Sequence, residues 1–335
     1  MSLAFGTPLE EALAGDDPVA RTLRAIADAC ARLAHIVARG PLQGSLAETV
    51  SERVGSADAQ TRLDVVADRL MQEALEHAPV RWLASEERAG VAALVAGAPL
   101  AVALDPLDGS SNIAANAPLG TIFSIRAAGE DALSTFLAPG REQLAAGFAI
   151  YGPLTALVLT FGAGVDVFVR DPDDGIFRLA RSGIRIPEDT REFAINASNR
   201  RHWSSGLQSW FDERLAGEAG PAARDFNMRW IASLVAEAYR ILERGGIFLY
   251  PADARPGYSR GRLRLVYEAA PIALLVERAG GLAVTGDGMR LLDVTGHDIH
   301  ERIPLIFGSR DAGAEFDLLS FPASDPPAGT GPHLR

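Results

Sequence analysis

The sequence predicts an α/β protein with two subdomains, and three observations support this class. Its 335 residues, of which 48% are hydrophobic, are enough to bury a large core. Amphipathic helical patterns alternate with short apolar strands, and closely spaced strands fill residues 145–181. Helices and strands start afresh near residue 191. We therefore expect subdomains over residues 1–185 and 186–322, followed by a disordered Pro- and Gly-rich tail over 323–335.

Two helices are expected at the start of the chain. Residues 16–38 carry apolar side chains at helical spacing, with Asp16 or Asp17 as the N-cap and Pro18 in the first turn. Residues 61–77 repeat this spacing and predict a second amphipathic helix.

Strands are expected next along the chain. Residues 80–85 predict a short strand that stops at Glu86-Glu87, and the apolar run 99–105 predicts a strand buried on both faces. A further strand is expected at 121–128, and the runs within 145–181 predict an antiparallel meander. The second half then continues with helices over 203–216 and 230–243, a strand over 245–252, a helix over 266–281 closed by Gly280-Gly281, a strand over 304–310 and a helix over 311–320.

Composition excludes several classes of function. The formal net charge of −11 argues against general nucleic-acid binding, which requires a basic face. All 32 basic residues are arginine, so a Schiff-base lysine and a P-loop lysine are both excluded. Cys30 is the single cysteine, so no internal disulfide forms and a reducing compartment is expected. No apolar run is long enough to span a bilayer and the acidic start does not resemble a secretory signal, so we expect a cytoplasmic protein without a membrane partner.

The stretch ALDPLDGSSNI, residues 103–113, places two acids at the end of the buried strand. The carboxylates of Asp105 and Asp108, with the backbone carbonyl of Leu107 between them, offer only oxygen ligands. Mg²⁺ and Mn²⁺ prefer oxygen sites that substrate phosphate completes, whereas zinc prefers nitrogen and sulfur ligands. The pattern therefore predicts a site for hard divalent cations, at which a phosphoryl displacement is catalysed.

The residues that follow are suited to a phosphate. Gly109 allows close approach of the backbone, and Ser110 and Ser111 supply hydroxyl groups and N–H groups at a predicted helix N-terminus. An ordinary type I turn is the alternative interpretation of DPLDGS. More carboxylates occur at element ends, although each alone is also compatible with a solvated surface position or a helix first turn: Asp58, Asp64, Glu86, Glu87 and Glu268.

Six segments together resemble class I fructose-1,6-bisphosphatase, from about residue 16 to residue 320 and in the order of that family. They are ASEE (84–87), LDPLDGSSNI (104–113), GTIFSI (120–125), GGIFLYPAD (245–253), GRLRLVYEAAPIALLVERAGG (261–281) and LDVTGHDIHERIPLIFGS (292–309). The resemblance implies a layered α-β-α-β-α sandwich, assembled as a homotetramer. It also implies Mg²⁺-dependent hydrolysis of the 1-phosphate of fructose 1,6-bisphosphate, a reaction of gluconeogenesis or the Calvin cycle. About two or three Mg²⁺ ions per subunit are expected, and Mn²⁺ is an expected substitute.

The resemblance also implies roles for individual residues. The metal ligands would be Glu86, Asp105, the Leu107 carbonyl, Asp108 and Glu268. Asp58 would lie on a loop that closes over the metals, while Asp64 and Glu87 would orient and deprotonate the attacking water. The 1-phosphate would contact Asp108, Gly109, Ser110 and Ser111.

The distal 6-phosphate of the substrate would be bound by a second group of residues: Asn196, Asn199, Arg229, Trp230, Tyr250 and Arg262. In the family the arginine at the Arg229 position reaches the site of a neighbouring subunit. The animal pattern has Tyr at the positions of Asn199 and Trp230 and Lys at that of Arg262, so hydroxyl contacts are lost at two places. Pro99-Leu100 replaces the Lys-Tyr pair of the animal AMP site, so weak inhibition by AMP is expected.

Alternatives of three kinds stay open at this point. Altered distal contacts are compatible with sedoheptulose 1,7-bisphosphate as the substrate, alone or as a second activity. The acid framework is also shared by inositol-phosphatase-like members of the wider superfamily. A sugar-phosphate sensor without catalytic activity is the non-enzymatic alternative, although it has no need of a water-activating pair of acids.

Overall fold

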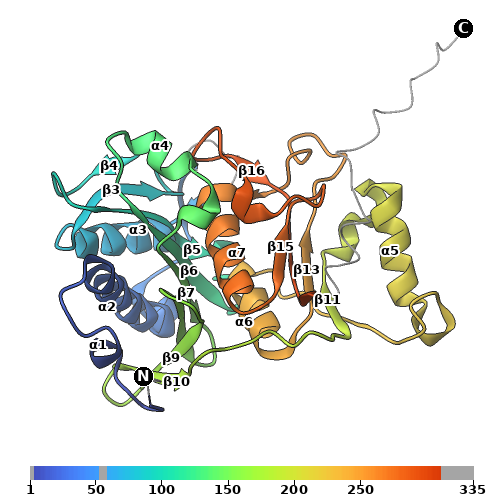
Figure 1. Ribbon diagram of the computed structural model, residues 1–335, viewed down its shortest axis with the longest axis horizontal. Helices are drawn as coiled ribbons and strands as arrows, with labels where there is room; N and C mark the ends of the chain where they lie inside the picture. Colours follow the sequence, from blue (N-terminus) through green and yellow to red (C-terminus); the bar gives the residue numbers. More distant parts are fainter. Residues whose placement is uncertain (1–3, 53–58, 311–335) are drawn as a thin grey trace, which may run out of the picture.

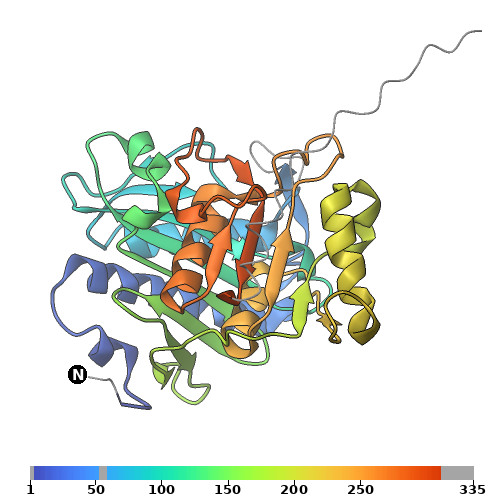
Figure 2. The same ribbon diagram turned by 45° about the vertical axis from the view of Figure 1, so that its right-hand side comes forward.

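Five layers, in the order α-β-α-β-α, make up the computed structural model, which describes residues 4–52 and 59–310 (Figure 1). Helices α2 (Pro18–Arg39) and α3 (Arg62–Leu75) cover the outer face of an eight-stranded sheet. Helices α6 (Leu234–Arg244) and α7 (Ala270–Arg278) lie between this sheet and a five-stranded one. Helix α5 (Ser205–Leu215) covers the far face of the five-stranded sheet (Figure 2). The predicted layered α/β fold is therefore confirmed.

The larger sheet has the strand order β10-β9-β8-β7-β6-β5-β3-β4, in which only β3 and β5 run parallel. It contains the predicted meander as its antiparallel half. Its strands are β3 (Val80–Ser85), β4 (Ala92–Ala93), β5 (Leu100–Asp108), β6 (Leu119–Ala127), β7 (Ala145–Tyr151), β8 (Thr155–Thr160), β9 (Asp166–Arg170) and β10 (Phe177–Arg181).

The smaller sheet has the order β12-β11-β13-β17-β15 and is mixed. Its strands are β11 (Glu192–Ala194), β12 (Asn227–Met228), β13 (Ile247–Tyr250), β15 (Leu282–Val284) and β17 (Leu305–Gly308). Two further strand pairs are β1 (Thr49–Glu52) with β2 (Ala59–Thr61), and β14 (Leu263–Arg264) with β16 (Arg302–Ile303). Short helices complete the described chain: α1 (Leu9–Ala12), α4 (Ala132–Leu137), a π-helix at Leu265–Ala269, and 3₁₀ turns at Gly40–Gln43, Ser110–Asn112, Gly140–Glu142, Ala197–His202, Gly217–Ala219 and Leu291–Asp293.

The two N-terminal helices begin where their capping residues predict. The Asp17 carboxylate accepts a hydrogen bond from the Ala20 N–H at 3.0 Å, which identifies Asp17 as the cap of α2. Thr61 and Asp64 form a reciprocal capping box at the start of α3, in which the Thr61 N–H donates to Asp64 at 2.7 Å. These caps fix the helices whose apolar faces cover the larger sheet.

Gly120 explains how closely α6 approaches the larger sheet. A Cβ at this position would lie 2.4 Å from Cγ2 of Val235, so any other residue would push the helix away. Gly120 is paired with Asp108 across β5 and β6. The N-terminus of α6 is thereby held beside the Asp108 carboxylate.

Two expectations are corrected, and others lie outside the described residues. Strand β5 runs through Asp108, three residues beyond the predicted end at 105, so Asp108 belongs to the strand as Asp105 does. Residues 110–112 form only a single 3₁₀ turn, so the predicted helix N-terminus, with its dipole, is wrong. The expected helix at 311–320 and the expected tail at 323–335 lie outside the described residues. In the part of the chain that the structure covers, no helix is long and apolar enough to cross a membrane.

Candidate active site

Three buried carboxylates converge at the end of β5. Ligand oxygens of Asp105, Asp108 and Glu268 lie within 4.8 Å of one another. On a regular strand, residues three apart point to opposite faces of the sheet. Here Asp105 is paired with Ile122 and Asp108 with Gly120, so β5 contains one more residue than β6 between these pairs. This bulge turns the two carboxylates toward the same side.

Glu268 reaches the cluster from a π-helical turn that precedes α7. The Ala270 N–H bonds to the Leu265 carbonyl, five residues back, and Pro271 has no N–H with which to continue an ordinary α-helical ladder. The Glu268 carboxylate is held in place by the Arg264 N–H, which donates to it at 2.6 Å. Glu268, which the resemblance implies to be a metal ligand, is therefore placed beside Asp105 and Asp108 by an irregular turn.

Glu86 and Glu87 arrive at the same edge of the sheet because β3 runs parallel to β5. The carboxyl ends of the two strands meet there, and the Glu86 N–H donates to the Leu104 carbonyl at 3.1 Å. The Glu86 carboxylate accepts a hydrogen bond from Nε of Arg264 at 3.2 Å, and that guanidinium is only 3% exposed. Glu87 is 7% exposed, and its carboxylate accepts from Nε2 of Gln60 at 2.8 Å.

The electrostatics of the cluster are those of crowded, buried acids. Burial raises the pKa of Asp108 to about 6, and the nearby Glu86 raises it too, although the Val235 N–H and Ser233 hydroxyl favour the ionised form. Burial, followed by the charges of Glu86 and Asp108, raises the pKa of Glu268 well above its usual range. Like charges at this density require a neutralising partner.

A divalent cation fits this donor set. The cluster contains carboxylate oxygens, which hard cations prefer, and its three residues are 3%, 7% and 7% exposed. The N–H of Leu107 donates to Asp105 at 3.0 Å and so orients that carboxylate. Metal binding would relieve the charge repulsion that raises the pKa values of Asp108 and Glu268.

The remaining residues predicted near the reacting phosphate lie in different settings. Asp64 is fully buried at the start of α3, where its carboxylate also serves the capping box. Gly109 has φ +79°, the left-handed conformation that glycine tolerates best, and it turns the chain from β5 into the 3₁₀ turn that contains Ser110 and Ser111. Asp58 lies outside the described residues.

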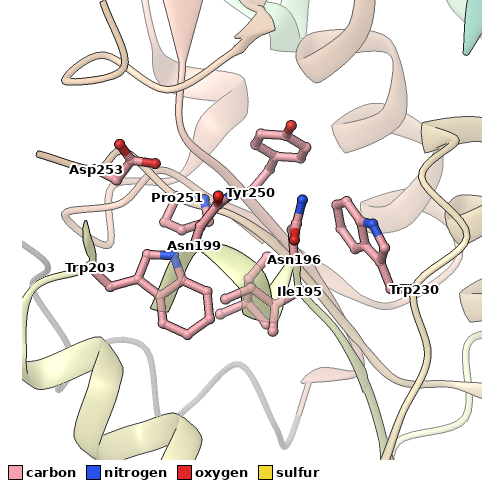
Figure 3. Close-up of a pocket in the computed structure, with 9 residues that line it drawn as sticks. Ile195, Asn196, Asn199, Trp203, Trp230, Tyr250, Pro251 and Asp253 are labelled. Carbon is pink, nitrogen blue, oxygen red and sulfur yellow. The ribbon is translucent and has the colours of Figure 1, made fainter. Parts of the chain in front are cut away.

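A second group of predicted residues lines one pocket (Figure 3). Asn196, Asn199, Trp230 and Tyr250 share it with residues that include Trp203 and Asp253. The side chains of Asn196, Tyr250 and Trp230 lie next to one another in this view, and the rings of Trp230 and Tyr250 are 5.8 Å apart. The structure thus brings together four of the six residues predicted for the distal phosphate.

Arg262 and Arg229 are the two that do not line this pocket. Nη1 of Arg262 donates to the Tyr258 hydroxyl at 2.7 Å. Burial raises the pKa of Tyr250, while the positive charge of Arg262 opposes that change and the negative charge of Glu268 adds to it. Nε of Arg229 is 3.5 Å from the Glu192 carboxylate, and its side chain is 51% exposed.

The sequence analysis missed several residues that shape the site. Arg264 contacts both Glu86 and Glu268, while Ser233 and the Val235 N–H each donate to Asp108 at 3.0 Å. A buried arginine cannot be distinguished from a surface one by residue type. The alternation of arginine and leucine over residues 262–265 would place the arginines on the exposed face of a strand, so this pattern gives no sign that Arg264 is buried.

The Ser233 hydroxyl donates a hydrogen bond to Asp108 and accepts one from the Ala236 N–H, so that it also caps α6. We expect Ser233→Ala to lower the free energy of unfolding by about 2 kcal/mol, because the cap and a buried hydrogen bond to a carboxylate are both lost. Ser204→Ala removes only the cap of α5 and is expected to cost about 1 kcal/mol. Urea unfolding measures both losses. Equal losses would contradict a separate contribution from Asp108.

Comparisons with known proteins point to one family. Residues 9–182 match the family model "Fructose-1-6-bisphosphatase, N-terminal domain", and residues 186–319 match "Fructose-1-6-bisphosphatase, C-terminal domain". The class 1 fructose-1,6-bisphosphatase of Bradyrhizobium sp. (strain ORS 278) is 55% identical over 304 residues, covering 91% of this chain and 85% of that protein. One from Methylorubrum extorquens is 48% identical over 343 residues, covering 99% of this chain and 97% of that protein.

A solved structure is also similar. The holo form of Leishmania major fructose-1,6-bisphosphatase superposes with a TM-score of 0.86 at 31% identity, covering 93% of this chain and 99% of that one. The two family models match nearly the whole chain, and the superposition agrees with the five layers. This chain belongs to the class 1 fructose-1,6-bisphosphatase family.

Proposed function

We propose that this chain hydrolyses the 1-phosphate of fructose 1,6-bisphosphate, giving fructose 6-phosphate and phosphate, with Mg²⁺ as its cofactor. The observation that carries the proposal is the buried cluster of Asp105, Asp108 and Glu268. Family membership makes the chain a phosphatase, and the cluster supplies the oxygen ligands that such a reaction needs. Mn²⁺ has the same ligand preference and is the expected substitute.

The proposed ligands are the carboxylates of Glu86, Asp105, Asp108 and Glu268, with the carbonyl of Leu107. Bound Mg²⁺ ions, about two or three, would polarise the phosphate and lower the pKa of water. Arg264 holds Glu86 and Glu268 in position through its side chain and its N–H. The bulge in β5 keeps both aspartates on one side, where the phosphate would bind.

Asp64 and Glu87 are proposed to orient the attacking water and to accept its proton. Both acids are buried, and a carboxylate can accept the proton of a water molecule within hydrogen-bond reach. Gly109, Ser110 and Ser111 would bind the 1-phosphate through N–H and hydroxyl groups, beside Asp108. Asp58 is proposed to complete the site.

The pocket between Trp203, Trp230 and Tyr250 is proposed to hold the sugar and its 6-phosphate. Asn196 and Asn199 would donate from their amides, and Arg262 would supply positive charge. Arg229 is proposed to reach a neighbouring subunit's site in a homotetramer, a role that requires it to leave Glu192. We further propose a cytoplasmic location and a reaction of gluconeogenesis or the Calvin cycle.

Phosphate release from a panel of substrates tests the proposal. We expect the purified chain to hydrolyse fructose 1,6-bisphosphate in Mg²⁺ and to lose activity in EDTA. The same assay with sedoheptulose 1,7-bisphosphate and inositol monophosphate measures specificity. A higher kcat/KM for inositol monophosphate would contradict the proposal, and a higher value for the seven-carbon sugar would change the substrate while keeping the chemistry.

A further inference from the structure

Asp68 on α3 contacts both residues that flank the Glu86-Glu87 pair. Its Oδ1 accepts from the Ser85 hydroxyl at 2.6 Å, and its Oδ2 accepts from Nε and Nη2 of Arg88 at 2.9 and 2.7 Å. The side chains of Asp68 and Arg88 are only 13% and 25% exposed. A partly buried ion pair with two hydrogen bonds holds its two side chains in a fixed relative position far better than a surface ion pair does.

Further hydrogen bonds link this network to Glu87 and to Arg264. The Ser85 hydroxyl accepts a hydrogen bond from the Glu87 N–H at 3.3 Å. Asp68 is therefore linked to the backbone of Glu87 through the Ser85 hydroxyl. On the other side of the turn, His300 Nε2 donates to the Arg88 carbonyl at 2.8 Å. The His300 carbonyl in turn accepts from Arg264 at 3.0 Å.

The position of Asp68 in α3 gives this network its significance. Asp64 lies four residues earlier in the same helix, and residues at this spacing share one helix face. The helix therefore contributes one proposed water-orienting acid directly and holds the turn that contains the other. Movement of the turn along α3 would change the separation of Asp64 and Glu87, and displacements of about 1 Å can cost about 100-fold in rate.

We propose that Asp68, together with Ser85 and Arg88, is a positioning clamp that sets Glu86 and Glu87 against Asp64. This inference rests on the proposed function for the roles of these acids. The three clamp residues contact one another and are not among the proposed metal or substrate ligands. It acts by fixing the turn between β3 and the acids, so its loss affects turnover and metal affinity more than substrate binding.

Asp68→Ala tests the clamp. We expect kcat for fructose 1,6-bisphosphate to fall about 100-fold with KM within about threefold, and the affinity for Mn²⁺, titrated by electron paramagnetic resonance, to fall about 10-fold. Asp68→Asn, which keeps an acceptor for Ser85 but loses the ion pair, is expected to retain more activity than the alanine variant. Glu73→Ala is the matched control, since it removes an exposed ion pair with Arg69 from the same helix.

A double variant separates positioning from general destabilisation. If Asp68 acts mainly through Glu87, adding Asp68→Ala to Glu87→Gln at saturating Mg²⁺ lowers kcat far less than the ~100-fold expected from Asp68→Ala alone. Independent, multiplicative losses would overturn the clamp. Should Asp68→Ala fail to fold, Arg88→Gln is measured in its place, with the same expectations at smaller size.

The readouts also distinguish this inference from the proposed function. An active wild type whose Asp68→Ala variant keeps its kcat and Mn²⁺ affinity overturns the clamp and leaves the function standing. A wild type that does not hydrolyse fructose 1,6-bisphosphate, but whose Mn²⁺ affinity falls in the variant, overturns the function and supports the clamp.

Discussion

Glu87→Gln lowers the kcat for fructose 1,6-bisphosphate about 1,000-fold and leaves KM within about threefold of the wild type, because an amide cannot accept the proton of the attacking water. The substitution conserves shape, and the amide oxygen can still accept the hydrogen bond from Gln60. Steady-state phosphate release at saturating Mg²⁺ measures kcat and KM together. An unchanged kcat would refute the role proposed for Glu87.

A substitution of Asp64 needs a control for helix stability, because its carboxylate has two roles. It is proposed to orient water, and it also accepts the Thr61 N–H in the capping box of α3. Thr61→Ala removes the other half of that box and is expected to cost about 1 kcal/mol in stability with little change in kcat. Asp64→Asn is expected to lower kcat as strongly as Glu87→Gln. Similar activity losses in the Thr61 and Asp64 variants would assign Asp64 to the helix cap alone.

The sequence predicts the elements well where one local pattern decides them. The capped helices α2 and α3, the buried strand β5 and the meander all follow from periodicity and turn residues. The order of strands in the sheets does not follow from local patterns, since it depends on which apolar faces pack together. The five layers were expected from the resemblance alone.

Some features of the site are likewise evident in the sequence, and others depend on the fold. Asp105 and Asp108 are evident from their motif, yet their common orientation depends on a bulge that leaves no mark in the residue spacing. Glu268 resembles an ordinary first-turn acid until the π-helix turns it inward. Arg264 and Asp68 act through side-chain contacts between elements distant in sequence, and such contacts become visible only once the fold is known.

The same burial that makes the cluster chemically useful makes it costly to fold. Because Asp108 has a folded pKa of about 6 against an ordinary 3.8, its contribution to stability is fully present below about pH 4 and is lost as pH rises through 6. This change corresponds to about 3 kcal/mol for a fully buried group. Glu268 shifts in the same direction, which adds to the loss.

Divalent cations are therefore expected to stabilise the protein strongly, and more so at high pH. At a concentration about 100 times the dissociation constant, Mg²⁺ adds about 2.7 kcal/mol and raises Tm by about 5 °C at pH 8. At pH 5 the cation must first displace the proton of Asp108, which weakens binding about 10-fold and about halves the rise in Tm. Differential scanning calorimetry with Mg²⁺ or EDTA at both pH values measures this.

Asp108→Asn provides the decisive comparison. Removing one buried charge is expected to raise Tm at pH 8 in EDTA, and at the same time to abolish most of the rise caused by Mg²⁺, since a ligand is lost. Asp212→Asn, at an exposed position on α5 that is 51% accessible, is the matched control and is expected to keep the full Mg²⁺ effect. A Mg²⁺ effect on Tm that is equal at pH 5 and pH 8 would show that the cation binds elsewhere, because only a site built from high-pKa carboxylates makes cations and protons compete in this range.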